Sequence, residues 1–141
     1  MRRKKLKIVY FDLETTGGRF HEIIQIGAKY MDERNCWQQY ILPDGEISYK
    51  ATEIHGMYKE DGIMYNSWQR PLAACSPSVG FNRFINFLYR VKGQSDNVTV
   101  VLCAHNCRSF DSHGKSFHYL FLETYKLRNN LSFCSFEKEL H

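Results

Sequence analysis

The stretch that decides the fold is KIVYFDLETTG, residues 7–17, in which an apolar run leads directly into two carboxylates. A continuous apolar run of this kind predicts a strand that is buried on both faces of a sheet. Asp12 and Glu14 are two positions apart, so in a strand their side chains point to the same face. Gly17 and Gly18 then allow the backbone to turn sharply and leave space for a ligand.

Two carboxylates at a strand end have two interpretations. Because like charges held this close repel, a cation between them is the usual compensation. Oxygen ligands suit Mg²⁺ or Mn²⁺, which keep part of their water shell and take up the phosphate oxygens of a substrate. The alternative is a solvated strand end that carries two acids, and the pair taken alone favours this alternative.

Two further stretches complete a predicted antiparallel meander of three strands. Residues 22–30, EIIQIGAKY, alternate between apolar and polar side chains as a half-buried strand does. Residues 37–42 form the third strand, which ends at the turn sequence Pro43-Asp44-Gly45. Since the connections are short, consecutive strands are expected to pair antiparallel.

The rest of the chain alternates between helix and strand. Apolar residues at a helical period predict helices over residues 81–91 and 110–124. Residues 98–104, VTVVLCA, and 131–136, LSFCSF, are predicted strands. Residues 48–74 are predicted to be loop with a short helical turn near Thr52. The order of elements indicates a single α/β domain over residues 1–141, with a mixed sheet and flanking helices.

Composition places the chain among ordinary globular proteins, with 43% hydrophobic and 15% aromatic residues. No apolar run reaches the ~18 residues of a membrane span, and no signal-type segment opens the chain. Five cysteines without a CxxC pair suggest reduced thiols, so an intracellular place, cytoplasmic or nuclear, is expected. The net charge of +4 is a weak indication of a polyanionic partner. The basic lead-in, residues 1–6, fits a solvated strand start, a phosphate-binding arm or a nuclear-import signal equally well.

A second polar constellation, HNCRSFD, follows the predicted strand 98–104. Its acid, Asp111, falls early in the next predicted helix, where the end of the strand can direct it toward the first two carboxylates. An acid in the first turn of a helix also complements the helix dipole, so Asp111 taken alone is weak evidence.

Taken together, the two constellations resemble the DEDD superfamily of 3′→5′ exonucleases, in its DnaQ-like (DEDDh) branch with an RNase H-like fold. The motifs that carry the resemblance are FDLETTG at 11–17 and AHNCRSFD at 104–111, each at the end of a predicted strand. EIIQIGA at 22–28 resembles the second strand of that family, and ATEIHGM at 51–57 resembles its A…IHGI segment. The likeness covers roughly residues 6–136 and implies an RNase H-like mixed sheet.

The resemblance implies a site with two divalent cations, Mg²⁺ or Mn²⁺. Asp12 would bridge the two ions, Glu14 would complete one of them and Asp111 would hold the other. Such a pair activates water on one side of a phosphodiester and stabilises the leaving oxygen on the other.

The resemblance also implies a substrate, the 3′ end of single-stranded DNA or RNA. Thr15, Thr16 and the backbone of Gly17 would lie against the terminal nucleotide. His105 and Asn106 resemble residues near the substrate, and no chemical role is assigned to them. Contacts of this kind do not read bases, so little sequence preference is expected.

One motif of the family is missing. The family has a general-base His followed five positions later by a metal-binding Asp on a final helix, whereas Asp111 is the last aspartate here. His118 and Glu123 have that separation, but they lie in the helix directly after Asp111 and about 140° apart around it. The fold is therefore expected to be C-terminally incomplete, with the general base unknown.

Truncation, decay and completion by a protein partner all explain the missing motif. Activity of the chain alone is expected to be weak or absent, since a general base contributes roughly 10²–10⁴ in rate. The alternative function is a non-catalytic nucleic-acid-binding or protein-interaction module of the same fold, and a small-molecule phosphoesterase also stays open.

Overall fold

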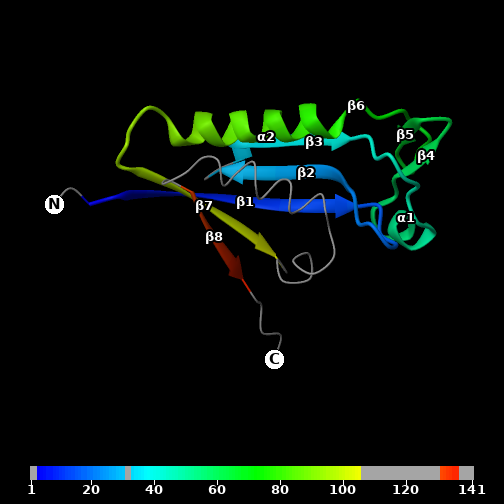
Figure 1. Ribbon diagram of the computed structural model, residues 1–141, viewed down its shortest axis with the longest axis horizontal. Helices are drawn as coiled ribbons and strands as arrows, with labels where there is room; N and C mark the ends of the chain where they lie inside the picture. The colour runs from blue at the N-terminus through cyan, green and yellow to red at the C-terminus, as the bar shows by residue number, and fades with distance from the viewer. Residues whose placement is uncertain (1–2, 31–32, 106–130, 137–141) are drawn as a thin grey trace.

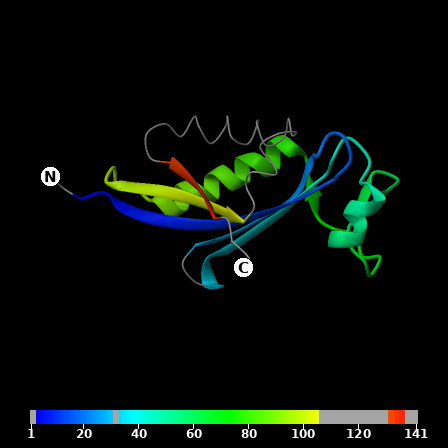
Figure 2. The ribbon, with the colours of Figure 1, turned by 90° about the horizontal axis from the view of Figure 1, so that it is seen from below.

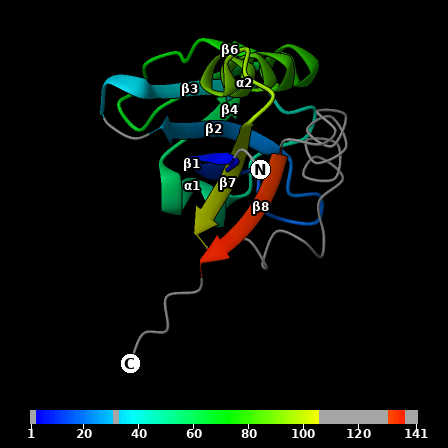
Figure 3. The same cartoon turned by 90° about the vertical axis from the view of Figure 1, so that its left-hand side faces the viewer.

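A computed structural model describes residues 3–30, 33–105 and 131–136, which form an α/β fold (Figure 1). Its centre is a six-stranded sheet in the order β6-β3-β2-β1-β7-β8. These strands span Lys5–Thr15 (β1), Ile23–Tyr30 (β2), Cys36–Ile41 (β3), Ala74–Cys75 (β6), Val98–His105 (β7) and Leu131–Phe136 (β8). Figure 3, seen from the end where β1 begins, shows the strands side by side in the order β3, β2, β1, β7, β8. The helix predicted over residues 110–124 lies outside the described residues.

The sheet is mixed, as the sequence predicts. β1 and β3 both pair antiparallel with β2, which is the predicted three-strand meander. β7 pairs parallel with β1 and β8 pairs parallel with β7. Because β1 and β7 are parallel neighbours, their carboxyl ends lie at the same edge of the sheet, which places the backbone of His105 beside the end of β1 that carries Asp12.

The prediction that the first strand is buried on both faces is wrong. Val9, Phe11 and Leu13 are buried on one face, whereas Ile8 and Tyr10 on the other face are 38% and 54% exposed. The continuous apolar run therefore conceals an alternating pattern. Within the described residues, a helix covers only the face that carries Phe11.

That helix is α2, Pro77–Lys92, and it lies along one face of the sheet (Figure 2). It begins with Pro77, whose fixed φ and missing N–H suit a first helical turn. Phe84 is fully buried, with its ring centroid 6.3 Å from that of Phe11 and 5.4 Å from that of Trp37. The helix predicted over 81–91 is thus confirmed, and its aromatic stripe forms the main core against β1, β2 and β3.

Residues 48–74 contain more structure than predicted. A short helix, α1 (Tyr49–His55), confirms the helical turn near Thr52. It is followed by a hairpin of β4 (Tyr58–Glu60) and β5 (Ile63–Tyr65), where the sequence predicts a loop. Three-residue strands are too short to show a period, which explains the error. A second small core of Ile24, Met57 and Met64 joins this region to the sheet. The 3₁₀ turn η1 (Glu33–Asn35) precedes β3.

Candidate active site

Asp12 and Glu14 project from β1 near its carboxyl end, on the face of the sheet that points away from α2. Asp12 is exposed and Glu14 is half-buried, while Leu13 between them is buried on the opposite face. The register between β1 and β2 shifts directly after Glu14, at the Glu14–Thr15 step. The chain therefore leaves the regular strand ladder at the second carboxylate.

The electrostatics of the pair are unfavourable for a second negative charge. Burial raises the pKa of Glu14 above its ordinary value of 4.5, and the Asp12 carboxylate raises it further. His55 at the end of α1 acts in the opposite direction and lowers the pKa of Glu14. Ionised Glu14 therefore lacks full compensation within the protein, and a bound cation would supply it.

The loop after β1 is closed at its base by Thr16 and Glu22. The backbone N–H of Thr16 donates to the carbonyl of Glu22 (2.9 Å), and the N–H of Glu22 donates to Oγ1 of Thr16 (3.0 Å). The Thr16 hydroxyl in turn donates to the carbonyl of Gly17 (3.2 Å). Thr16 is only 2% exposed. Its polar atoms are thus engaged inside the protein, which gives this predicted substrate residue a structural role.

Thr15 and Gly17, on either side of Thr16, are less deeply buried than Thr16. Oγ1 of half-buried Thr15 accepts a 3.3 Å hydrogen bond from the N–H of Gly17. Gly17 has φ +61°, and a Cβ at this position would lie 2.6 Å from Oγ of Ser48. A glycine is required here both for the left-handed backbone and for the close approach of α1.

A groove of about 500 Å³ lies beside Asp12 on the open face of the sheet, between Tyr10, Lys29 and Gln38. Gly27 of β2 is directly opposite Asp12 in the register. A Cβ on Gly27 would meet no atom of the described residues within 4 Å, so none of their side chains fills the space next to the Asp12 carboxylate. Glycine inside a strand is typical of places where a ligand or another backbone comes close.

The second constellation is described only in part. His105 is the last residue of β7, one position beyond the Phe11–Ala104 pair, so its backbone lies at the level of Asp12. Asn106 and Asp111 lie outside the described residues. Within the described ranges, no three histidine, cysteine, aspartate or glutamate side chains gather as a metal site. The two described carboxylates still fit Mg²⁺ or Mn²⁺, because these ions accept one or two protein carboxylates and complete their shell with water and phosphate oxygens.

Three residues around this site were not predicted as functional: Glu22, Ser48 and Lys59. Ser48 is the N-cap of α1, and its Oγ accepts from the N–H of Ala51 at 3.2 Å. A serine directly before a helical turn is a local signal that could have revealed this cap. The contacts of Glu22 and Lys59 join segments far apart in the chain, and no local pattern announces them.

Comparison with solved structures shows the same fold in exonuclease I. The zinc-bound E. coli ExoI–ssDNA complex has a TM-score of 0.62 at 14% identity, over 93% of this chain and 28% of that chain. Exonuclease I from Methylocaldum szegediense has a TM-score of 0.61 at 14% identity, over 92% of this chain and 27% of that chain. The RNase H-like fold is confirmed.

The chain spans less than a third of the length of these exonucleases. No protein-family model matches the sequence, and the search of curated proteins finds no match. Because one fold hosts many activities, a likeness at this identity establishes architecture and leaves function to the site. Among the described residues, no helix combines the length and apolar character that a membrane span requires.

Proposed function

We propose that this chain carries the core of a 3′→5′ exonuclease-type domain, which hydrolyses phosphodiester bonds at nucleic-acid 3′ ends with the help of two divalent cations. The observation that carries the proposal is the pair Asp12 and Glu14 on one face of β1, at the carboxyl edge of an exonuclease I-like sheet. Burial and the Asp12 charge raise the pKa of Glu14, which is the electrostatic state that a divalent cation relieves.

In this proposal Asp12 and Glu14 hold the cations, together with Asp111. When bound, two such ions supply an activated water and stabilise the leaving oxygen. The open groove beside Asp12 leaves room for the phosphodiester, since Gly27 places no side chain there. The carboxylates would hold the ions in place, and the general base stays unassigned.

Single-stranded DNA or RNA is the proposed substrate. Thr15, which directly follows Glu14, and Gly17 are the residues that we propose to contact the terminal nucleotide. Solved relatives of the fold include complexes of E. coli exonuclease I with ssDNA and with a dT13 oligonucleotide, which supports single-stranded substrates for this fold. Phosphate and sugar contacts of this kind do not distinguish sequences.

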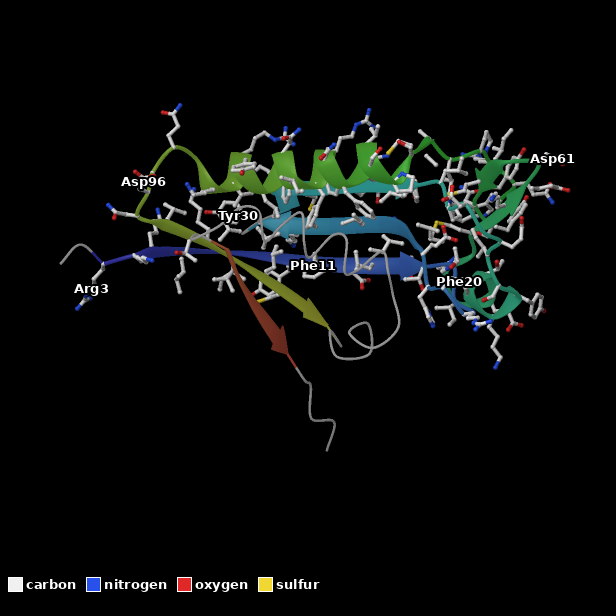
Figure 4. The ribbon with its side chains drawn as sticks, in the orientation of Figure 1. Arg3, Phe11, Phe20, Tyr30, Asp61 and Asp96 are labelled. Atoms are coloured by element: carbon white, nitrogen blue, oxygen red, sulfur yellow. The ribbon has the colours of Figure 1, made fainter. Side chains whose placement is uncertain are left out.

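The test is hydrolysis of a 5′-labelled single-stranded oligonucleotide, as DNA and as RNA, in the presence of Mn²⁺. We expect a ladder of products shortened from the 3′ end that disappears in Asp12→Ala. Asp96→Ala is the matched control, because Asp96 is an exposed acid at the opposite end of the molecule from α1 (Figure 4). Shortening that persists in Asp12→Ala would contradict the proposal.

A non-catalytic nucleic-acid-binding module is the second candidate. It is a candidate because one fold hosts many activities, and the fold likeness alone does not establish catalysis. This candidate predicts that the oligonucleotide binds and is not shortened. Binding measured by fluorescence anisotropy, alongside the hydrolysis assay, therefore separates the two functions.

A further inference from the structure

The backbone between Glu14 and Gly17, which we call the neck, is held by hydrogen bonds from outside the strand. β1 pairs with β2 in regular register up to Glu14, and the register shifts at the next residue. Beyond this point the carbonyl of Thr15 has a partner in α1, and the carbonyl of Thr16 has one in Ser48, the N-cap of α1. The residues beside Glu14 are thus held by α1 in addition to the pairing of Thr15 with Ile23 and the hydrogen bonds between Thr16 and Glu22.

Residues at both ends of helix α1 make hydrogen bonds to the neck. At its start, the backbone N–H of Ser48 donates to the carbonyl of Thr16 at 2.8 Å. At its end, Nε2 of His55 lies 3.1 Å from the carbonyl oxygen of Thr15. Two consecutive carbonyls are therefore bound by residues at opposite ends of a single short helix.

The contacts of the His55 ring define which nitrogen carries the proton. Nδ1 accepts a 3.1 Å hydrogen bond from the backbone N–H of Met57. In the neutral ring the proton then sits on Nε2, which donates to the Thr15 carbonyl. His55 thus makes two separable contacts, one within the turn after α1 and one to the neck.

The start of α1 is anchored independently of His55. The Glu22 carboxylate accepts from the backbone N–H groups of Asp44 and Gly45, both at 2.9 Å. On the other side of the same turn, Nζ of Lys59 donates to the carbonyls of Pro43, Asp44 and Gly45 at 3.0–3.2 Å. This turn lies two residues before Ser48. Loss of the His55 side chain therefore leaves the start of α1 attached to the protein.

We propose that His55 is a positioning residue, whose hydrogen bond to the Thr15 carbonyl fixes the neck and thereby aims the Glu14 carboxylate at the cation site. The inference rests on the proposed function, because the quantity that His55 controls is cation binding by Glu14 and Asp12. Outer partners that orient metal ligands are typically worth roughly 10- to 100-fold in metal affinity.

Two substitutions separate the contacts of His55. In His55→Gln the amide NH₂ reaches the place of Nε2, so the donor to Thr15 is kept and the acceptor for Met57 is lost. In His55→Asn the amide oxygen takes the place of Nδ1, so the acceptor is kept and the donor is lost. The measurement is Mn²⁺ affinity by isothermal titration calorimetry, with a thermal melt of each variant to show that it is folded.

We expect His55→Asn to weaken Mn²⁺ binding by roughly 10- to 100-fold and His55→Gln to bind as the unchanged chain does. The reverse order would show that His55 serves only the turn after α1 and would overturn the proposal. Equal affinities in both variants, weak or strong, would overturn it as well, because the donor to Thr15 would then not decide binding.

A second readout needs no metal. Amide hydrogen exchange of Thr16, Glu22 and Ser48 reports on the hydrogen bonds of the neck. We expect faster exchange at these amides in His55→Asn and unchanged exchange in His55→Gln. If the unchanged chain binds no Mn²⁺, the proposed function fails, and the exchange pattern still decides whether His55 holds the neck.

Discussion

At the scale of single residues, the protein environment disfavours the charged form of Glu14 and raises its pKa above the ordinary value. Burial is the main cause of its raised pKa, the Asp12 carboxylate is the second, and His55 opposes both. A carboxyl group whose pKa is higher in the folded than in the unfolded state binds its proton more tightly when folded. Stability therefore falls as the pH rises through the window between 4.5 and the raised pKa of Glu14.

Glu14→Gln removes this ionisation. At pH 7 without metal, we expect the variant to unfold at a higher temperature than the unchanged chain. The expected gain in the free energy of unfolding is about 0.5 kcal/mol, the scale of partly exposed charge interactions. Below pH 4 the advantage disappears, because Glu14 is then protonated in both states. Thermal melts across this pH range check the expectation, and an advantage that grew on acidification would contradict it.

We expect added Mn²⁺ to reverse this order of stability. A cation that binds only the folded chain raises its melting temperature by mass action. We expect Mn²⁺ to stabilise the unchanged chain at pH 7 and to leave Glu14→Gln unaffected. The same melts with added Mn²⁺ or with a chelator measure this, and equal stabilisation of the two chains would place the cation elsewhere.

Gly17 and Gly18 allow a matched test of the loop. Both have positive φ, +61° and +67°, but only at Gly17 would a Cβ meet a neighbour, Oγ of Ser48 at 2.6 Å. We expect Gly18→Ala to cost about 1–2 kcal/mol for the left-handed backbone, and Gly17→Ala to cost more. Urea unfolding provides the two free energies. Equal losses would mean that α1 moves freely away from the loop.

At the scale of elements, α1 and the turn before it act as a brace on the end of β1. The brace is polar: the Glu22 carboxylate and the Lys59 ammonium hold opposite sides of residues 43–45. Hydrogen bonds to charged groups are the stronger kind. The orientation of the site thus depends on contacts that lie outside it.

Glu22→Gln tests the brace. A glutamine has a single acceptor oxygen, so one of the two N–H groups of Asp44 and Gly45 loses its partner. Because both hydrogen bonds are exposed and water can replace the lost partner, we expect a loss of about 0.5–1.5 kcal/mol in the free energy of unfolding and weaker Mn²⁺ binding. Glu53→Gln, an exposed glutamate of α1, is the control and should change neither. An unchanged stability of Glu22→Gln would show that the turn holds without its carboxylate.

At the scale of the whole molecule, one helix and a mixed sheet form the core that positions the site. Phe84 of α2 is the centre of this core, with its ring near those of Phe11, Trp37 and Phe87. Phe11 lies one position before Asp12, on the opposite face of β1. Packing against α2 therefore fixes the strand from behind, while the carboxylates face outward.

Phe84→Ala should cost about 3–5 kcal/mol, a large part of the stability of a domain of this size. Phe20→Ala is the control, because Phe20 is 65% exposed at the α1 end of the molecule (Figure 4), and it should stay within about 0.5 kcal/mol. Chemical unfolding of both variants measures the difference. Similar losses would contradict the placement of the core.

The sequence by itself determined the meander, helix α2 and the shared face of Asp12 and Glu14. These features follow from periods of two or 3.6 residues, which are local and readable in a single segment. The third acid, Asp111, and the exonuclease function stay predictions from motif and resemblance.

Only the tertiary structure decided which face of β1 is buried, because the apolar run is compatible with burial on either side. It also decided that Thr16 is internal, that residues 58–65 pair as a hairpin, and that His55 binds the carbonyl of Thr15, forty positions away. Contacts across such separations depend on how the elements pack, and no local period contains that information.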